Sequence, residues 1–128
     1  MIVVDTSVAV AALLGHGPAR VAMADQRLVA PHLIDAEVAH ALRGLALGGK
    51  VTAAQGDGLI RAWGRVQLDR LPMPPLLPRA WELRDNLTAY DALFVAAAEA
   101  HHLTLVTADR RLAAASGPRC TIELIPSS

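Results

Sequence analysis

The sequence predicts an α/β fold, with a parallel, doubly wound sheet of about five short strands flanked by helices. Three observations indicate it. Short apolar runs rich in Val, Ile and Leu recur along the chain, and segments with helical spacing of apolar residues separate them. No repeat, low-complexity tract or linker interrupts this alternation. At 128 residues the chain has the usual length of one domain, so we expect one domain over residues 1–128.

The first half of the chain is expected to form two strands and four helices. Gly15 ends the first helix, Pro31 precedes the long one, and Gly48 and Gly49 end it. Thr52 and Gln55 have the spacing of a capping box and open the fourth helix. The expected strands are residues 2–4 and 28–30, and the expected helices are residues 8–14, 18–24, 33–47 and 52–68.

The second half continues the same alternation. Residues 71–73 are expected to form a short strand at the edge of the sheet, because Pro72 cannot donate a ladder hydrogen bond. Pro74 and Pro75 then introduce a helix with Leu77, Ala80, Trp81 and Arg84 along one side. A further helix is expected at 88–101, strands at 104–106 and 121–124, and a short helix at 109–115.

The composition favours a protein that associates with a partner. Apolar residues make up 53% of the chain, above the roughly 45–50% usual for soluble domains, so a monomer would leave apolar surface in water. The longest apolar runs, 8–14 and 92–98, are far shorter than the roughly 20 residues that cross a bilayer. The start lacks a basic and apolar leader, and the single Cys120 forms no internal disulfide. We therefore expect a cytoplasmic protein, with Cys120 buried in a strand.

Formal net charge is zero, so the overall charge gives no support for nucleic-acid binding. The positions of the acidic residues are more informative. Asp5 follows the first expected strand and Asp109 follows the strand at 104–106. Active-site crevices of such sheets lie beyond the carboxyl ends of the strands. Asp91, at a helix start, and Glu37, within the long helix, complete a set of four candidates.

Each of these acids also has a purely structural interpretation. Asp5 and Asp109 fit as helix N-caps, and Asp91, three residues after Thr88, fits the acid of a capping box. Glu37 is different, because its helical neighbours Leu33, Ile34, His40 and Ala41 form a largely apolar side. A carboxylate on such a side needs a partner, either His40 or an ion. Asp35, on another side of the helix, is expected to be solvated.

Together the four acids predict a site for a hard cation, Mg²⁺ or Mn²⁺, because clustered carboxylates repel unless a cation compensates them. Such a site can activate a water for phosphodiester hydrolysis and needs no protein nucleophile. The sequence has no zinc-ligand spacing, no G-x-S-x-G motif and no glycine-rich phosphate loop. The pair His101 and His102 is interpreted as an exposed helix end.

Four segments resemble the PIN-domain family. They are the opening strand with its acid at residues 2–7, the helix-borne Glu37, the motif at 87–92 that contains Asp91, and the motif at 106–112 that contains Asp109. The compact length is similar to that of the VapC branch of the family. The resemblance spans nearly the whole chain.

This resemblance implies a metal-dependent endoribonuclease that hydrolyses RNA and acts as the toxin of a VapBC-like toxin–antitoxin system. A homodimer inhibited by a small cognate antitoxin is expected from it. It also implies that Asp5, Glu37, Asp91 and Asp109 surround Mg²⁺ or Mn²⁺, with a hydroxyl of Thr6 or Thr107 nearby. Arg84 would approach the site or the antitoxin; alternatively, it packs on its helix and pairs with Glu82, Asp85 or Asp91.

Other classes of protein fit the residues less well. A phosphate-accepting receiver domain needs a Lys late in the chain, but the only Lys is Lys50. An aspartyl-phosphate phosphatase would have an acid where Ser7 stands. The non-enzymatic alternative is an α/β assembly or binding module whose acids only cap helices. Metal binding would distinguish it from the nuclease.

Overall fold

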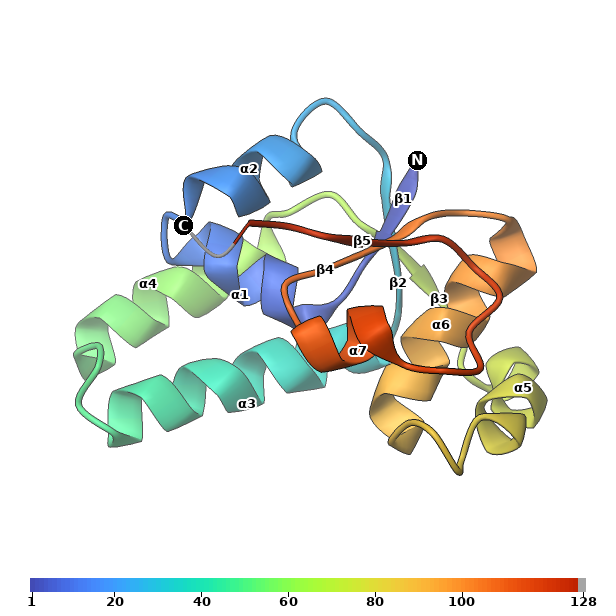
Figure 1. The fold of residues 1–128 in the computed structure, drawn as a ribbon. Helices are drawn as coiled ribbons and strands as arrows, with labels where there is room; N and C mark the ends of the chain where they lie inside the picture. The colour runs from blue at the N-terminus through green and yellow to red at the C-terminus, as the bar shows by residue number, and fades with distance from the viewer. Residues whose placement is uncertain (127–128) are drawn as a thin grey trace.

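Five short parallel strands form one sheet at the centre of the molecule (Figure 1). The computed structural model describes residues 1–126, so the last two residues of the expected domain, 127 and 128, lie outside the described range. The strands are β1 (Ile2–Val4), β2 (Leu28–Pro31), β3 (Asp69–Leu71), β4 (Leu105–Thr107) and β5 (Ile122–Leu124). They lie in the order β3-β2-β1-β4-β5, and each pairing is parallel. The predicted α/β fold is confirmed.

Helices cover both faces of this sheet. They are α1 (Thr6–Leu13), α2 (Gly17–Met23), α3 (Leu33–Leu47), α4 (Ala53–Gly64), α5 (Leu77–Glu82), α6 (Ala89–His101) and α7 (Arg110–Ala114), with a 3₁₀ turn η1 (Pro74–Leu76). Helices α1 to α4 pack against one another on one side, whereas α6 packs on β1, β2 and β4 from the other, together with α5 and η1 (Figure 1). This is the doubly wound arrangement.

The connectivity creates one switch point in the sheet. From β1 the chain moves outward to β2 and β3, and it then returns to β4 on the opposite side of β1. Right-handed crossovers in opposite directions place their helices on opposite faces, which leaves a crevice between the carboxyl ends of β1 and β4. Any side chain placed directly after these two strands therefore faces the same crevice.

The core is built where α6 lies on the sheet. Every residue from Ala92 to Ala98 is buried, and most are Ala, so the helix backbone approaches the strands closely. Phe94 fills the remaining space and is 1% exposed. Because α6 is held along this length, its first turn, which carries Asp91, has a fixed position over the end of the sheet.

Three expectations about local structure were wrong. The fourth helix, expected to run to residue 68, ends at Gly64. The third strand is residues 69–71 rather than 71–73, because Pro72 has no N–H and the strand ends before it; its place at the sheet edge is confirmed. Asp35 is not merely solvated. It accepts hydrogen bonds from Trp63 Nε1 at 2.8 Å and from Arg70 Nε at 2.6 Å, and so joins α3 to α4 and β3.

The segment around α5 and the residues before β5 also differ from expectation. Of the apolar residues expected along one side of α5, Leu77 and Trp81 are exposed and only Ala80 is buried. Arg84 lies over the ring of Trp81, 4.8 Å from its centroid, and the ion pairs of residues 1–126 do not include it. Cys120 lies in a bend before β5, partly buried, rather than in the strand. No helix in residues 1–126 is both long and apolar enough to span a bilayer.

Candidate active site

Asp5 is the most buried carboxylate at the carboxyl edge of the sheet. It directly follows β1, caps α1 by accepting a hydrogen bond from Val8 N at 3.1 Å, and is only 5% exposed. Ser7 Oγ donates to its Oδ1 at 2.6 Å, and Thr107 Oγ1 donates to its Oδ2 at 2.5 Å. Both carboxylate oxygens are therefore held in fixed directions.

The end of β4 brings a second acid to this place. β1 and β4 are neighbours with Val4 opposite Val106, so Thr107 lies beside Asp5. Thr107 is fully buried, and its Oγ1 accepts a hydrogen bond from Asp109 N at 3.0 Å. The Asp109 side chain caps α7 by accepting from Arg111 N at 2.8 Å. The expectation that Asp5 and Asp109 cap helices is confirmed.

Glu37 reaches the same crevice from α3. Its Oε1 accepts a hydrogen bond from Thr6 Oγ1 at 2.7 Å, which links the third helix to the first turn of α1. His40, the other side chain considered as its partner, is exposed and makes no hydrogen bond to it. The carboxylate of Glu37 is thus oriented by the residue that follows Asp5.

Asp91 stands in the first turn of α6. Its backbone N–H donates to Thr88 Oγ1 at 3.2 Å, so Thr88 caps the helix. Within residues 1–126, the Asp91 carboxylate accepts no hydrogen bond and forms no ion pair, so the return bond of a capping box is missing. This partly buried acid therefore has no structural partner that explains its charge.

The four carboxylates influence one another. Burial raises the pKa of Asp5, and repulsion from Asp109 adds to this although the bonds from Ser7 and Thr107 oppose it. Burial also raises the pKa of Asp91, with further contributions from Asp109 and Asp5. The pKa of Glu37 is raised by burial and by Asp91, against the bond from Thr6. None of the ion pairs within residues 1–126 includes any of the four acids.

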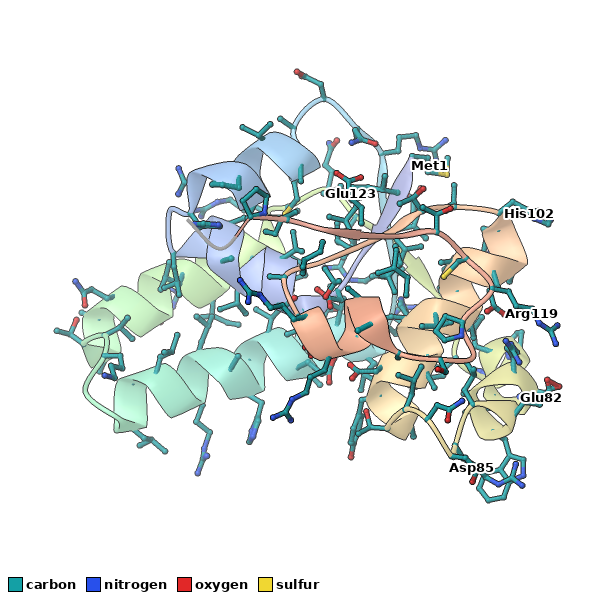
Figure 2. All side chains as sticks on the ribbon, in the orientation of Figure 1. Met1, Glu82, Asp85, His102, Arg119 and Glu123 are labelled. Carbon is teal, nitrogen blue, oxygen red and sulfur yellow. The ribbon has the colours of Figure 1, made fainter. Side chains whose placement is uncertain are left out.

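The opposite end of α6 provides a contrast. Figure 2 shows His102 and Arg119 projecting there, at the edge of a cavity of about 520 Å³ that Glu99 and Cys120 also line. Burial tends to raise the pKa of Glu99, but two hydrogen bonds from Arg79 and one from Arg119 N outweigh it and lower this pKa. Glu99 is therefore a carboxylate whose charge is satisfied by a cationic partner, Arg79. His101 and His102 are exposed, as expected of a helix end.

The arrangement suits a hydrated hard cation. Within residues 1–126, no three Asp, Glu, His or Cys side chains form a group that could hold a metal ion. Mg²⁺ does not need such a group of three, because it keeps several waters and takes one or two carboxylates together with substrate phosphates. The available donors are carboxylate and hydroxyl oxygens, which such cations prefer. The partnerless carboxylate of Asp91 is the strongest indication that a cation is part of the site.

Two residues of this region were not identified from the sequence. Ser7 links both strands, because its Oγ donates to Asp5 and accepts from Ala108 N at 2.9 Å. Its position two residues after Asp5 was the only signal. Tyr90, the single tyrosine of the chain, lines a cavity beside Glu37, and its position next to Asp91 could have suggested this.

Comparison with known proteins agrees with this geometry. The family model of the PIN domain matches residues 2–118. The chain belongs to the PIN-domain family. Ribonuclease VapC9 of Mycobacterium tuberculosis is 48% identical over 126 residues, which cover 98% of this chain and 99% of that protein. The resemblance of this PIN-domain chain to the VapC branch is therefore confirmed.

Solved structures show the same PIN-domain fold. The crystal structure of PAE2754 from Pyrobaculum aerophilum matches with a TM-score of 0.71 and 28% identity, over 96% of this chain and 83% of that one. A toxin–antitoxin complex from Klebsiella pneumoniae matches with a TM-score of 0.65 over 89% of this chain and 91% of that one. At 18% identity, the second likeness is one of fold.

The raised pKa values predict how pH affects the metal-free PIN domain. A folded state in which burial raises the pKa of Asp5 binds its proton more tightly than the unfolded chain does, so this contribution to stability is present at low pH and lost as pH rises through the folded pKa. In EDTA at pH 7, Asp5→Asn should therefore melt above the parent, by about 4 °C for each kcal/mol relieved. The difference should shrink as the pH falls toward about 4. Calorimetric melting against pH measures it.

Asp57→Asn is the matched control, because Asp57 is an exposed acid paired with Arg61 and should leave the melting temperature nearly unchanged. Asn retains N-capping ability, so loss of the α1 cap does not confuse the comparison. If Asp5→Asn melts below the parent across pH 5 to 8, the charge on Asp5 stabilises the fold and the electrostatic argument is wrong.

Proposed function

We propose that this chain is a Mg²⁺- or Mn²⁺-dependent endoribonuclease that acts as the toxin of a VapBC-like toxin–antitoxin pair. The carboxylate of Asp91 carries the metal part of the proposal, because it is partly buried, beside two other acids, and without a hydrogen-bond donor or cationic partner in residues 1–126. The ribonuclease part is supported by the 48% identity to VapC9 over almost the whole chain.

Each side chain has a role in this proposal. Asp5, Asp91, Asp109 and Glu37 would hold the ion. When bound there, Mg²⁺ would supply a Lewis acid for the phosphodiester and would lower the pKa of a water. Ser7 and Thr107 fix the two oxygens of Asp5, and Thr6 fixes Glu37. Because these hydroxyls donate to carboxylates, Thr6 and Thr107 act by orienting the acids.

The proposal predicts RNA cleavage that depends on a divalent cation. Purified protein should cleave single-stranded RNA with Mg²⁺ or Mn²⁺, and EDTA should abolish cleavage. Attack by water on phosphorus, with the 3′-oxygen as the leaving group, leaves a 5′-phosphate and a 3′-hydroxyl. Asp5→Asn, Asp91→Asn and Asp109→Asn should each lower kcat by at least about 100-fold, and Glu37→Gln by about 10- to 100-fold. Product ends and rates are read from labelled oligonucleotides.

Two results would contradict this mechanism. A 2′,3′-cyclic phosphate product would mean that the RNA attacks itself. If the Asn variants cleave RNA as fast as the parent, the charges of these acids are not needed for the chemistry, and the acids only cap helices. Asp57→Asn again serves as the control that should change neither rate nor melting.

The antitoxin partner and the homodimer belong to the same proposal. The Klebsiella pneumoniae structure of similar fold is a toxin–antitoxin complex. An apolar groove of about 220 Å³, lined by residues such as Leu13, Met23, Leu59 and Val66, runs between α1, α2 and α4 and suits the apolar side of a helix. Exposed Val21 and Leu47, 77% and 72% accessible, are further apolar surface suited to a second copy or partner. Light scattering reports the dimer.

Control by an antitoxin predicts a growth phenotype. Expression of this chain alone should halt the growth of its host, and coexpression of a small protein encoded beside it should restore growth. Asp5→Asn should remove toxicity but still copurify with that protein, because it deletes charge without changing the shape of the groove. Growth arrest that persists in Asp5→Asn would separate toxicity from the carboxylate chemistry.

A further inference from the structure

A cavity of about 550 Å³ opens directly beside the carboxylates. Thr6 and Glu37 form one part of its wall, and Leu33, Ala36, His40, Ala41 and Tyr90 form the rest. The hydrogen bond between Thr6 and Glu37 is thus shared between the acid cluster and the cavity. Its size falls in the range of small-molecule sites, roughly 300–1,000 Å³. Hydrolysis by metal-activated water needs no such chamber, so the cavity calls for a separate explanation.

Tyr90 is placed at the mouth of this cavity rather than in the core. It is 59% exposed although it lies one residue before Asp91 and three before the buried Leu93 on α6. An exposed aromatic ring exposes apolar surface to water and contributes little to folding. Tyr90 directly precedes Asp91, a carboxylate of the site. Because α6 is packed along the sheet, the backbone that carries both residues has a fixed position.

The chemistry of the walls selects the kind of group that fits. The carboxylate of Glu37 repels a phosphate, and the apolar side chains of Leu33 and Ala41 favour a neutral, flat group. Bases of single-stranded RNA are such groups, and proteins bind them by stacking on aromatic rings. With a cation bound to the acids, a phosphate held there would leave the base of an adjoining nucleotide near Tyr90, because Tyr90 directly precedes Asp91 on α6.

We infer that this cavity binds the base next to the scissile phosphate, stacked on Tyr90, and so contributes to substrate binding. The inference rests on the proposed ribonuclease function and adds a base-binding subsite to it. His40, exposed at the wall, provides a ring nitrogen for the edge of the base. Removal of the Tyr90 ring and removal of the base should therefore abolish the same stacking contact.

The test measures kcat and KM on one short single-stranded RNA whose cleavage position has been mapped. Tyr90→Ala should raise KM about tenfold with little change in kcat, because stacking is lost in both the ground state and the transition state. Tyr90→Phe keeps the ring and should behave as the parent. Trp81→Ala, which removes an exposed ring outside the cavity, is the matched control and should leave KM unchanged.

An abasic nucleotide identifies what the ring contacts. Placed on the correct side of the cleaved bond, it should raise the KM of the parent by the same factor as Tyr90→Ala, and combining the two changes should cost no more than either one. Unchanged KM in Tyr90→Ala, or effects that multiply, would overturn the inference. So would a Tyr90→Ala protein that cleaves normally but escapes its inhibitor, because the cavity would then hold a protein. A parent that cleaves no RNA overturns the proposed function as well.

Discussion

Burial of the Asp5 carboxylate at the switch point of the sheet imposes a condition that the surrounding residues must meet. A charge that is only 5% exposed is costly unless donors or a cation compensate it. Three donors do so in part, from Ser7, Val8 and Thr107, and these come from both sides of the crevice. They do not suffice, because the pKa of Asp5 remains raised and Asp109 adds repulsion. This incomplete compensation supports the proposal that a cation binds beside Asp5.

The carboxylates of this protein differ in whether an Arg side chain pairs with them. Asp35 forms an ion pair with Arg70 that joins α3 to β3. Glu99 forms an ion pair with Arg79 that joins α6 to α5. Their pKa values are lowered, so their charge is satisfied within the fold. At the carboxyl edge, the side chains of Asp5, Glu37 and Asp109 accept hydrogen bonds from hydroxyl or backbone groups, and that of Asp91 accepts none. No Arg or Lys forms an ion pair with any of these four acids within residues 1–126. The presence of an Arg partner therefore distinguishes the acids that join elements of the fold from the acids of the candidate site. It can be recognised only when the partner of each acid is known.

Most of the fold could be predicted from the sequence because the residues that start and end its helices are easily identified. Gly48 and Gly49 follow the end of α3, and the Thr52 capping box that was predicted is present at the start of α4. The third strand was predicted in the wrong place because Pro72 indicates a position at the edge of the sheet but does not determine which residues form the strand. The roles of Asp35 and Ser7 could not be predicted, since each depends on a partner far away in the chain: Arg70 in one case and Ala108 in the other. The acids after β1 and β4 could be predicted, because parallel topology alone brings them together.

The uncompensated carboxylates at the switch point should bind a divalent cation if the proposed function is correct. Titration of the EDTA-treated and dialysed protein with Mn²⁺ in a calorimeter tests it most directly, with Asp5→Asn measured beside the parent. The parent should bind the ion saturably and release protons from the groups whose pKa is raised, in an amount that grows as the pH is lowered, and Asp5→Asn should not bind it. Equal heats in both proteins, or no saturable binding by the parent, would contradict it.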